Sequence, residues 1–374
     1  MVETDFVVFR EALEDELRQP PFEVIRTRRR RRSARLAAGG AALAVVLLIA
    51  GVAAAGLRPT DRPAPAPAVT GPVRAQLVAV AATPSKVLYA VVNPCGADCP
   101  LTLVASKDLG RQWTRVSTVD GADGTQHGRL YATDATHLWM LTADSLVSST
   151  DGGKTWRAPW HLTRGDRPLL AAVGDGRLWL VVGGRLYRST GAGGLEPTQA
   201  PADAQAVAPA GPGRALVRSG GVTWYSTIDD GAHWTPAANP CDATAVLSTM
   251  SIGPDGTRWA VCVHEPVTDN QPKELRVSTD GGNVWYRRGT LESSGYGTDV
   301  YPVSATVAWR TGPRSDIHRT TDGTQWTDTA HVGGTGGPDT FVALDADTAL
   351  YSAGGAVYLT RDGGRTWTDL HFVP

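Results

Sequence analysis

The sequence predicts an all-β fold, a seven-bladed β-propeller of four-stranded antiparallel blades, preceded by one transmembrane α-helix. Two observations predict the propeller: the phrase Ser/Thr-x-Asp-x-Gly-x-x-Trp, here called the box, returns about every 42 residues, and a short apolar run recurs in step with it. A third observation, an uncharged run of 22 residues near the N-terminus, predicts the helix.

Residues 1–35 are expected to form a cytoplasmic tail that ends in a polybasic juxtamembrane segment, in which Arg28 to Arg32 are consecutive. Residues 10–18 have the pattern of one short amphipathic helix, which Pro20 would end. This helix could dock a cytoplasmic partner. We favour a disordered tail that sets the topology and contacts anionic lipid, because so few of its residues are apolar.

Residues 36–57 carry no charge and are long enough to cross a bilayer as a helix. Arginines crowd the N-terminal end of this run, so the positive-inside rule places the tail in the cytoplasm and the rest of the chain outside it. We therefore expect a single-pass protein of the cell (plasma) membrane. The alternative is a cleaved signal peptide with its site near Ala53 to Gly56, for which 35 preceding residues are unusually many.

Residues 58–72 contain five prolines and are expected to form an extended, partly polyproline linker. Residues 73–374 follow as the extracytoplasmic propeller, in which seven units average about 43 residues, the length of one blade. The box is repeated with Asp108 and Trp113, Asp151 and Trp156, Asp229 and Trp234, Asp280 and Trp285, Asp322 and Trp326 (one residue short), and Asp362 and Trp367. A seventh copy, Ser189 to Leu195, keeps only the glycines.

The box is expected to be a turn between the third and fourth strands of a blade. Its aspartate would accept hydrogen bonds from the turn's amides, its glycine would supply a positive φ, and its tryptophan would pack between strands. The second strand of each blade is predicted at an apolar marker residue: Tyr89, Trp139, Trp179, Val217, Trp259, Trp309 and Tyr351. Calcium binding or acid chemistry by the box aspartates is the alternative, which their spread of one per blade disfavours.

At these residues the chain resembles the Asp-box, or BNR-repeat, propellers, which include sialidases, sortilin-type receptor domains, some endoglucanases and photosystem II assembly factors. The resemblance covers residues 73–374 and implies the fold. It does not imply sialidase chemistry, because no Arg-Ile-Pro motif occurs and the propeller region holds only four glutamates. Arginine outnumbers lysine 32 to 4, which is typical of a high-GC bacterial genome.

Four cysteines fall in the segment expected outside the cytoplasm, where thiols are normally oxidised. Cys95 and Cys99 share a tight loop. Cys241 enters the fifth blade and Cys262 ends its second strand, at the same rim if successive strands are antiparallel. We predict two disulfides, Cys95 with Cys99 and Cys241 with Cys262. A zinc site is the alternative, which lacks a Cys-x-x-Cys spacing.

Blades one and five carry insertions of about eight residues between their second and third strands, because the marker lies 24 and 26 residues before the box tryptophan there, against 16 or 17 elsewhere. These insertions share the rim opposite the boxes with the links between blades. We predict a ligand face there, with the candidates His127, Arg129, Tyr131, Trp160, His161, Arg164, Asp166, Arg167, Glu265, Glu292, Tyr296, Asp299 and Tyr301. The alternative for each is an ordinary solvated loop residue.

The leading functional hypothesis is a membrane-anchored binding module for a protein, peptide or glycan, without catalysis. The first alternative is a sialidase-like glycoside hydrolase, which would need two carboxyl groups at a matched separation. The second is a sensor that signals to the cytoplasmic tail. The sequence predicts no cofactor and no metal, and the net charge of -1 predicts no nucleic-acid partner.

Overall fold

The structure, a computed structural model, describes residues 75–372 except 95–98, 120–127, 143, 158–159, 164–167, 174–175, 222, 243–244, 265–271, 292–298, 313–315 and 332–339. Residues 71–374 form one compact unit. The predicted tail, transmembrane segment and linker lie outside the described residues. Within the described ranges, no helix has the length and apolarity needed to cross a membrane.

Seven four-stranded antiparallel sheets follow one another along the chain, as predicted. Blade one contains β1 (Gln76–Ala82), β2 (Leu88–Asn93), β3 (Thr102–Ser106) and β4 (Thr114–Thr118). Blade two contains β5 (Arg129–Ala132), β6 (Leu138–Leu141), β7 (Ser145–Ser149) and β8 (Trp160–His161). Blade three contains β9 (Leu169–Val173), β10 (Arg177–Val182), β11 (Arg185–Ser189) and β12 (Leu195–Pro197). Blade four contains β13 (Ala204–Gly211), β14 (Arg214–Ser219), β15 (Thr223–Thr227) and β16 (Thr235–Pro236).

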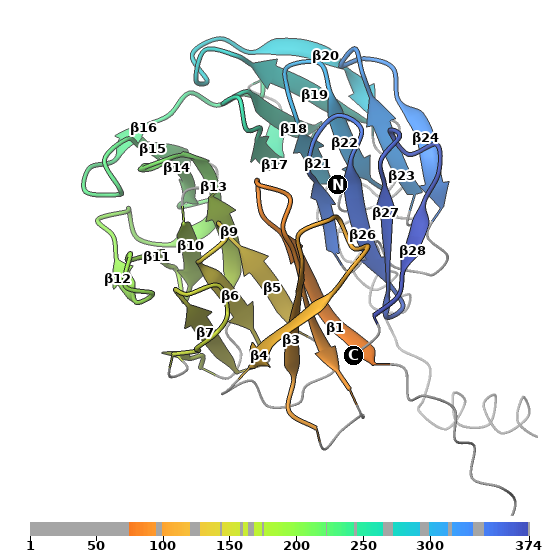
Figure 1. Cartoon of the computed structure of the whole chain (residues 1–374). Coiled ribbons are helices and arrows are strands. Elements are labelled where there is room, and N and C mark those ends of the chain that lie inside the picture. Colours follow the sequence, from red (N-terminus) through yellow and green to blue (C-terminus); the bar gives the residue numbers. More distant parts are fainter. Residues whose placement is uncertain are drawn as a thin grey trace, which may run out of the picture. The chain divides into compact units, whose positions relative to one another are not determined.

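Blade five contains β17 (Ala245–Ile252), β18 (Arg258–His264), β19 (Lys273–Ser278) and β20 (Tyr286–Leu291). Blade six contains β21 (Asp299–Pro302), β22 (Ala308–Thr311), β23 (Asp316–Thr320) and β24 (Thr327–His331). Blade seven contains β25 (Thr340–Ala343), β26 (Ala349–Ala353), β27 (Ala356–Thr360) and β28 (Thr368–Leu370). Around the centre of the unit (Figure 1), first strands contact one another at the junctions of blades one and two, three and four, four and five, five and six, six and seven, and seven and one.

The second-strand markers form the packing between blades. Trp139, Trp179, Val217, Trp259 and Trp309 are at most 2 % exposed, and each lies in the second strand of its blade. Several markers also donate a hydrogen bond to the turn between the first two strands of the following blade: Tyr89 Oη to the Ala135 carbonyl, Trp259 Nε1 to Ser304 and Trp309 Nε1 to Asp345. These aromatic residues therefore join neighbouring blades.

The ring closes by packing of blade one on blade seven, without a shared strand. Residues of both blades form one apolar cluster, and the ring of Trp113 lies 4.8 Å from that of Phe372. An ion pair between Lys86 and Asp345 and a hydrogen bond from Arg361 to the Leu109 carbonyl add polar contacts. These interactions hold the first and last blades together.

The box is the predicted turn between the third and fourth strands. In blade two, Ser149 Oγ donates to Asp151 Oδ1 at 2.8 Å, and the same carboxylate accepts the Thr155 amide at 3.0 Å. Gly153 has φ +85°, and a Cβ there would lie 2.1 Å from Leu103 of blade one, so glycine is required both for conformation and for space. The short copy in blade six keeps the same bonds with one residue fewer.

The structure confirms the bridge between Cys241 and Cys262, which ties the link entering blade five to its second strand. Cys99 is disulfide-bonded, and its predicted partner Cys95 lies outside the described residues. The two predicted insertions are also present as long connections, between β2 and β3 and between β18 and β19.

Candidate functional site

The antiparallel strand order separates the two faces of the propeller. Each box shares its face with the turn between the first two strands of the blade, as the hydrogen bond from the Gly152 amide to the Thr136 carbonyl shows. The connections between second and third strands, which include both insertions, lie on the opposite face together with the links between blades. The inner strands β5 and β21 begin at this second face.

Three charged residues begin strands at this second face and are linked by their electrostatics. Arg129 and Asp299 are the first residues of β5 and β21, and Lys273 begins β19. The positive charges of Lys273 and Arg129 both act on the carboxyl group of Asp299 and oppose the rise of its pKa. Arg129 and Asp299 come from blades two and six, which are not neighbours in the ring. We call these three residues the mouth.

Burial shapes the electrostatics of the mouth. Asp299 reaches water, yet protein surrounds it on most sides, and this burial raises the pKa of its carboxyl group, against the opposing effect of Lys273 and Arg129. Lys273 is only 5 % exposed, and burial lowers the pKa of its ammonium group. The mouth therefore presents both signs of charge in a partly desolvated setting, where electrostatic interactions are stronger than in open water.

Tyr131 and Tyr301, both predicted for the ligand face, lie next to the mouth and pack between blades. The ring of Tyr301 lies 4.7 Å from that of Phe341 in blade seven. Burial raises the pKa of each phenol, and Arg129 donates a hydrogen bond to Tyr131. Their rings are half-buried, so they support the mouth and leave only part of their surface for a ligand.

Two predicted residues within the described ranges, Trp160 and His161, are not brought to the mouth. Trp160 and His161 form β8, the outermost strand of blade two, and three strand spacings of about 4.8 Å put β8 about 14 Å from β5. Seven candidates lie outside the described residues: His127, Arg164, Asp166, Arg167, Glu265, Glu292 and Tyr296.

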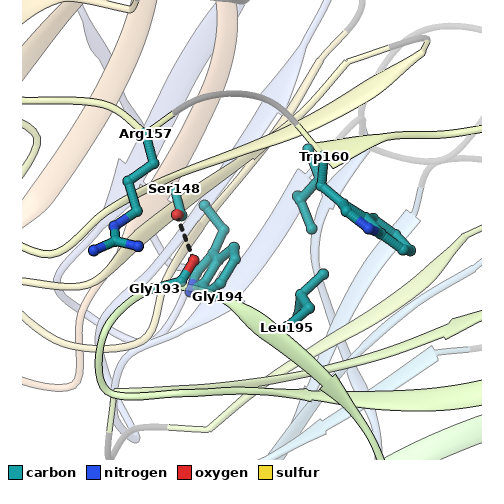
Figure 2. Close-up of a pocket in the computed structure, with 8 residues that line it drawn as sticks. Ser148, Arg157, Trp160, Gly193, Gly194 and Leu195 are labelled. Carbon is teal, nitrogen blue, oxygen red and sulfur yellow. Dashed lines mark hydrogen bonds between the residues drawn. The ribbon is translucent and has the colours of Figure 1, made fainter.

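A cavity of about 360 Å³ lies between blades two and three, away from the mouth. Its lining residues are Trp139, Leu146, Ser148, Arg157, Trp160, Gly193, Gly194 and Leu195. Figure 2 shows Arg157 and Trp160 on opposite sides of this cavity, with the hydrogen bond from Ser148 to the Gly193 carbonyl between them. Trp160 also contacts Tyr187 of blade three, with ring centroids 5.4 Å apart. We call this cavity the crevice.

Sequence reasoning missed Lys273 at the mouth and Arg157 and Leu195 at the crevice. Lys273 is one of only four lysines and lies at the end of the insertion of blade five. Its rarity and position could have marked it as a candidate site residue. The damaged box of blade three was noticed, but its consequence for packing depends on what the tryptophan does in the other blades. That role is visible only in three dimensions.

Comparisons with known proteins agree with the fold. A structure of YCF48 bound to D1 peptide is 17 % identical, covering 78 % of this chain and 92 % of that one, with a TM-score of 0.50. YCF48 from Cyanidioschyzon merolae is 14 % identical over 80 % of this chain and 98 % of that one, with a TM-score of 0.52. An ancestral GH74 enzyme is 13 % identical over 81 % of this chain and 47 % of its own, with a TM-score of 0.53.

No family model and no curated protein sequence matches the chain. At such low identity, the structural neighbours show the seven-bladed propeller fold alone, and assign no activity to this chain. The function must be argued from its own residues.

Proposed function

We propose that the chain is a single-pass protein of the cell membrane whose extracytoplasmic propeller binds a polypeptide segment of a partner protein at the mouth. The observation that carries this proposal is that two cations from other blades, Arg129 and Lys273, both act electrostatically on the partly desolvated carboxyl group of Asp299. The cations of such a site can pair with a carboxylate of the ligand, and its aspartate can accept a hydrogen bond from a donor of the ligand. Together these groups can orient a polar ligand. A neighbour of the same fold is bound to a peptide, which supports the proposal by analogy.

The position of the insertions also favours this face. The long connection between β18 and β19 ends at Lys273, so a loop of variable length directly adjoins the charged site. Recognition surfaces are commonly built in this way, from loops that a rigid scaffold positions. A glycan is a second class of ligand that mixed charges, hydroxyls and tyrosines could hold.

Peptide and glycan arrays test the proposal. The full chain would be compared with Arg129→Gln, Asp299→Asn and the control Arg115→Gln, an exposed arginine of the outer strand β4. We expect saturable binding to a peptide set, weakened about tenfold or more by either mouth variant and unchanged by the control. Equal binding by all four proteins would refute a role of the mouth.

A glycoside hydrolase is the second candidate, and the raised pKa of Asp299 is the observation that favours it. A raised pKa extends the pH range over which a carboxylic acid keeps a proton that it can donate to a leaving group. A panel of fluorogenic glycosides decides between the two functions. Turnover by the wild-type chain that Asp299→Asn abolishes would replace binding with hydrolysis as the function.

Membrane anchoring is a separate part of the proposal, based on the uncharged run 36–57 and the arginines before it. An N-terminal tag should be recovered in the membrane fraction, attached to the intact chain. Release of an untagged propeller into the medium would contradict the anchor and support a cleaved signal peptide.

A further inference from the structure

The crevice arises from one residue of the damaged box in blade three. In blade seven, Leu359 pairs with Thr368, the residue after the box residue Trp367. In blade three, the equivalent pair is Arg188 with Glu196, the residue after Leu195. The strand register therefore places Leu195 where the other six boxes have tryptophan.

Box tryptophans normally fill the space between their own blade and the preceding one. Three of them meet the second-strand tryptophan of that blade edge to face: Trp234 with Trp179 at 6.3 Å, Trp326 with Trp259 at 6.4 Å, and Trp367 with Trp309 at 6.2 Å. At the junction of blades two and three, Leu195 replaces the indole that would meet Trp139. A leucine side chain is shorter and narrower than an indole, and the cavity of about 360 Å³ lies at this point.

The walls of the crevice combine an apolar interior with one positive charge. Trp139, Leu146, Leu195 and Trp160 supply the apolar surface. Arg157 is exposed at its edge, and no carboxylate in the described ranges forms an ion pair with it. The Ser148 hydroxyl is already bonded to the Gly193 carbonyl at 2.8 Å. A ligand would therefore gain most from an aromatic group and a negative charge near it.

We propose that the crevice binds an acidic, tryptophan-bearing segment of a partner polypeptide, whose indole takes the place of the missing box tryptophan while a flanking carboxylate pairs with Arg157. Two features of the site support this occupant: the six other boxes place an indole at the equivalent position, and the one cation at the edge lacks a carboxylate partner within the described ranges. The size of the cavity falls within the range of small-ligand pockets. This inference does not depend on the mouth, because the crevice lies at another junction of the ring.

Fluorescence anisotropy with short labelled peptides tests the proposal on the full chain in detergent. The probe is Gly-Ser-Gly-Asp-Trp-Asp-Gly-Ser-Gly, compared with versions that have alanine for tryptophan or asparagine for both aspartates. We expect the probe to bind at least tenfold more tightly than the alanine version, and more tightly than the asparagine version. Equal binding of the probe and the alanine version, or no saturable binding at millimolar peptide, would overturn the proposal.

Two variants locate the binding. Leu195→Trp supplies the missing box tryptophan and fills the crevice, so we expect it to weaken the affinity for the probe at least tenfold while the melting temperature stays the same or rises. Arg157→Gln should remove the preference for aspartate over asparagine, whereas the control Arg115→Gln should change nothing. Full affinity in Leu195→Trp with an unchanged or higher melting temperature would refute the site. Binding that emerges only after residues 1–72 are removed would assign the crevice to the chain's own N-terminal segment instead, and would refute a partner polypeptide as its occupant.

Discussion

At the scale of single residues, the box aspartates act as acceptors within their own turns. Hydrogen bonds from the His233 amide and imidazole lower the pKa of Asp229 to about 2, and those from the Thr366 hydroxyl and amide lower the pKa of Asp362 to about 2. Each carboxylate therefore stabilises its turn in the ionised form. This role matches the predicted one.

This chemistry predicts how stability depends on pH. The folded pKa of Asp362 lies below the value of about 3.9 for an unfolded aspartate, so its contribution is present above pH 3.9 and is lost as the pH falls through 2. Thermal melting followed from pH 6 to pH 2 should show a falling melting temperature below about pH 4. The variant Asp362→Asn should have a lower melting temperature than the wild type at pH 6, and its melting temperature should fall less steeply as the pH decreases.

The control for this prediction is Asp369→Asn, which changes an exposed carboxylate in the strand β28. Its melting curve should follow that of the wild type at every pH. A wild-type melting temperature that rises on acidification would show that the box carboxylates do not stabilise their turns.

At the scale of elements, the contacts between blades depend on buried aromatic residues. Trp259 is 1 % exposed, meets Trp326 of blade six and donates to the Ser304 carbonyl. Trp259→Ala should lower the free energy of unfolding by about 3–5 kcal/mol, because it leaves a cavity and an unpaired carbonyl. Urea unfolding followed by far-ultraviolet circular dichroism measures this change.

Tyr286→Ala serves as the matched control, because the side chain of Tyr286 is 59 % exposed. We expect a change within about 0.5 kcal/mol. An equal loss of unfolding free energy in Trp259→Ala and Tyr286→Ala would mean that the second-strand aromatic residues do not hold the blades together.

The disulfide in blade five also acts at this scale. It closes a loop with a sequence separation of 21 between Cys241 and Cys262. Replacing both cysteines with alanine should cost about 3 kcal/mol of stability, because the unfolded chain loses that constraint. Thiol titration of the unreduced wild type should find neither cysteine reactive, and a melting temperature unaffected by the double replacement would show that the bridge adds nothing.

At the scale of the whole molecule, the repeated box and the marker residues were enough to predict the seven blades, the turn between the third and fourth strands and the face of the insertions. These features depend on local sequence and on regular spacing. The mouth was predicted only in part, because Arg129 and Asp299 come from blades far apart in the sequence and Lys273 stood out only as the end of an insertion. The crevice could not be predicted, because it follows from how a tryptophan packs on the neighbouring blade.

The boxes stabilise their own turns, and the mouth on the opposite face is the proposed binding site of the array peptide. Titration calorimetry with the strongest peptide from the array tests this division most directly, using Asp299→Asn from the mouth and Asp322→Asn from a box. We predict that Asp299→Asn loses affinity about tenfold with little change in melting temperature, while Asp322→Asn melts lower and binds as the wild type does. Loss of affinity in Asp322→Asn with unchanged affinity in Asp299→Asn would contradict the account.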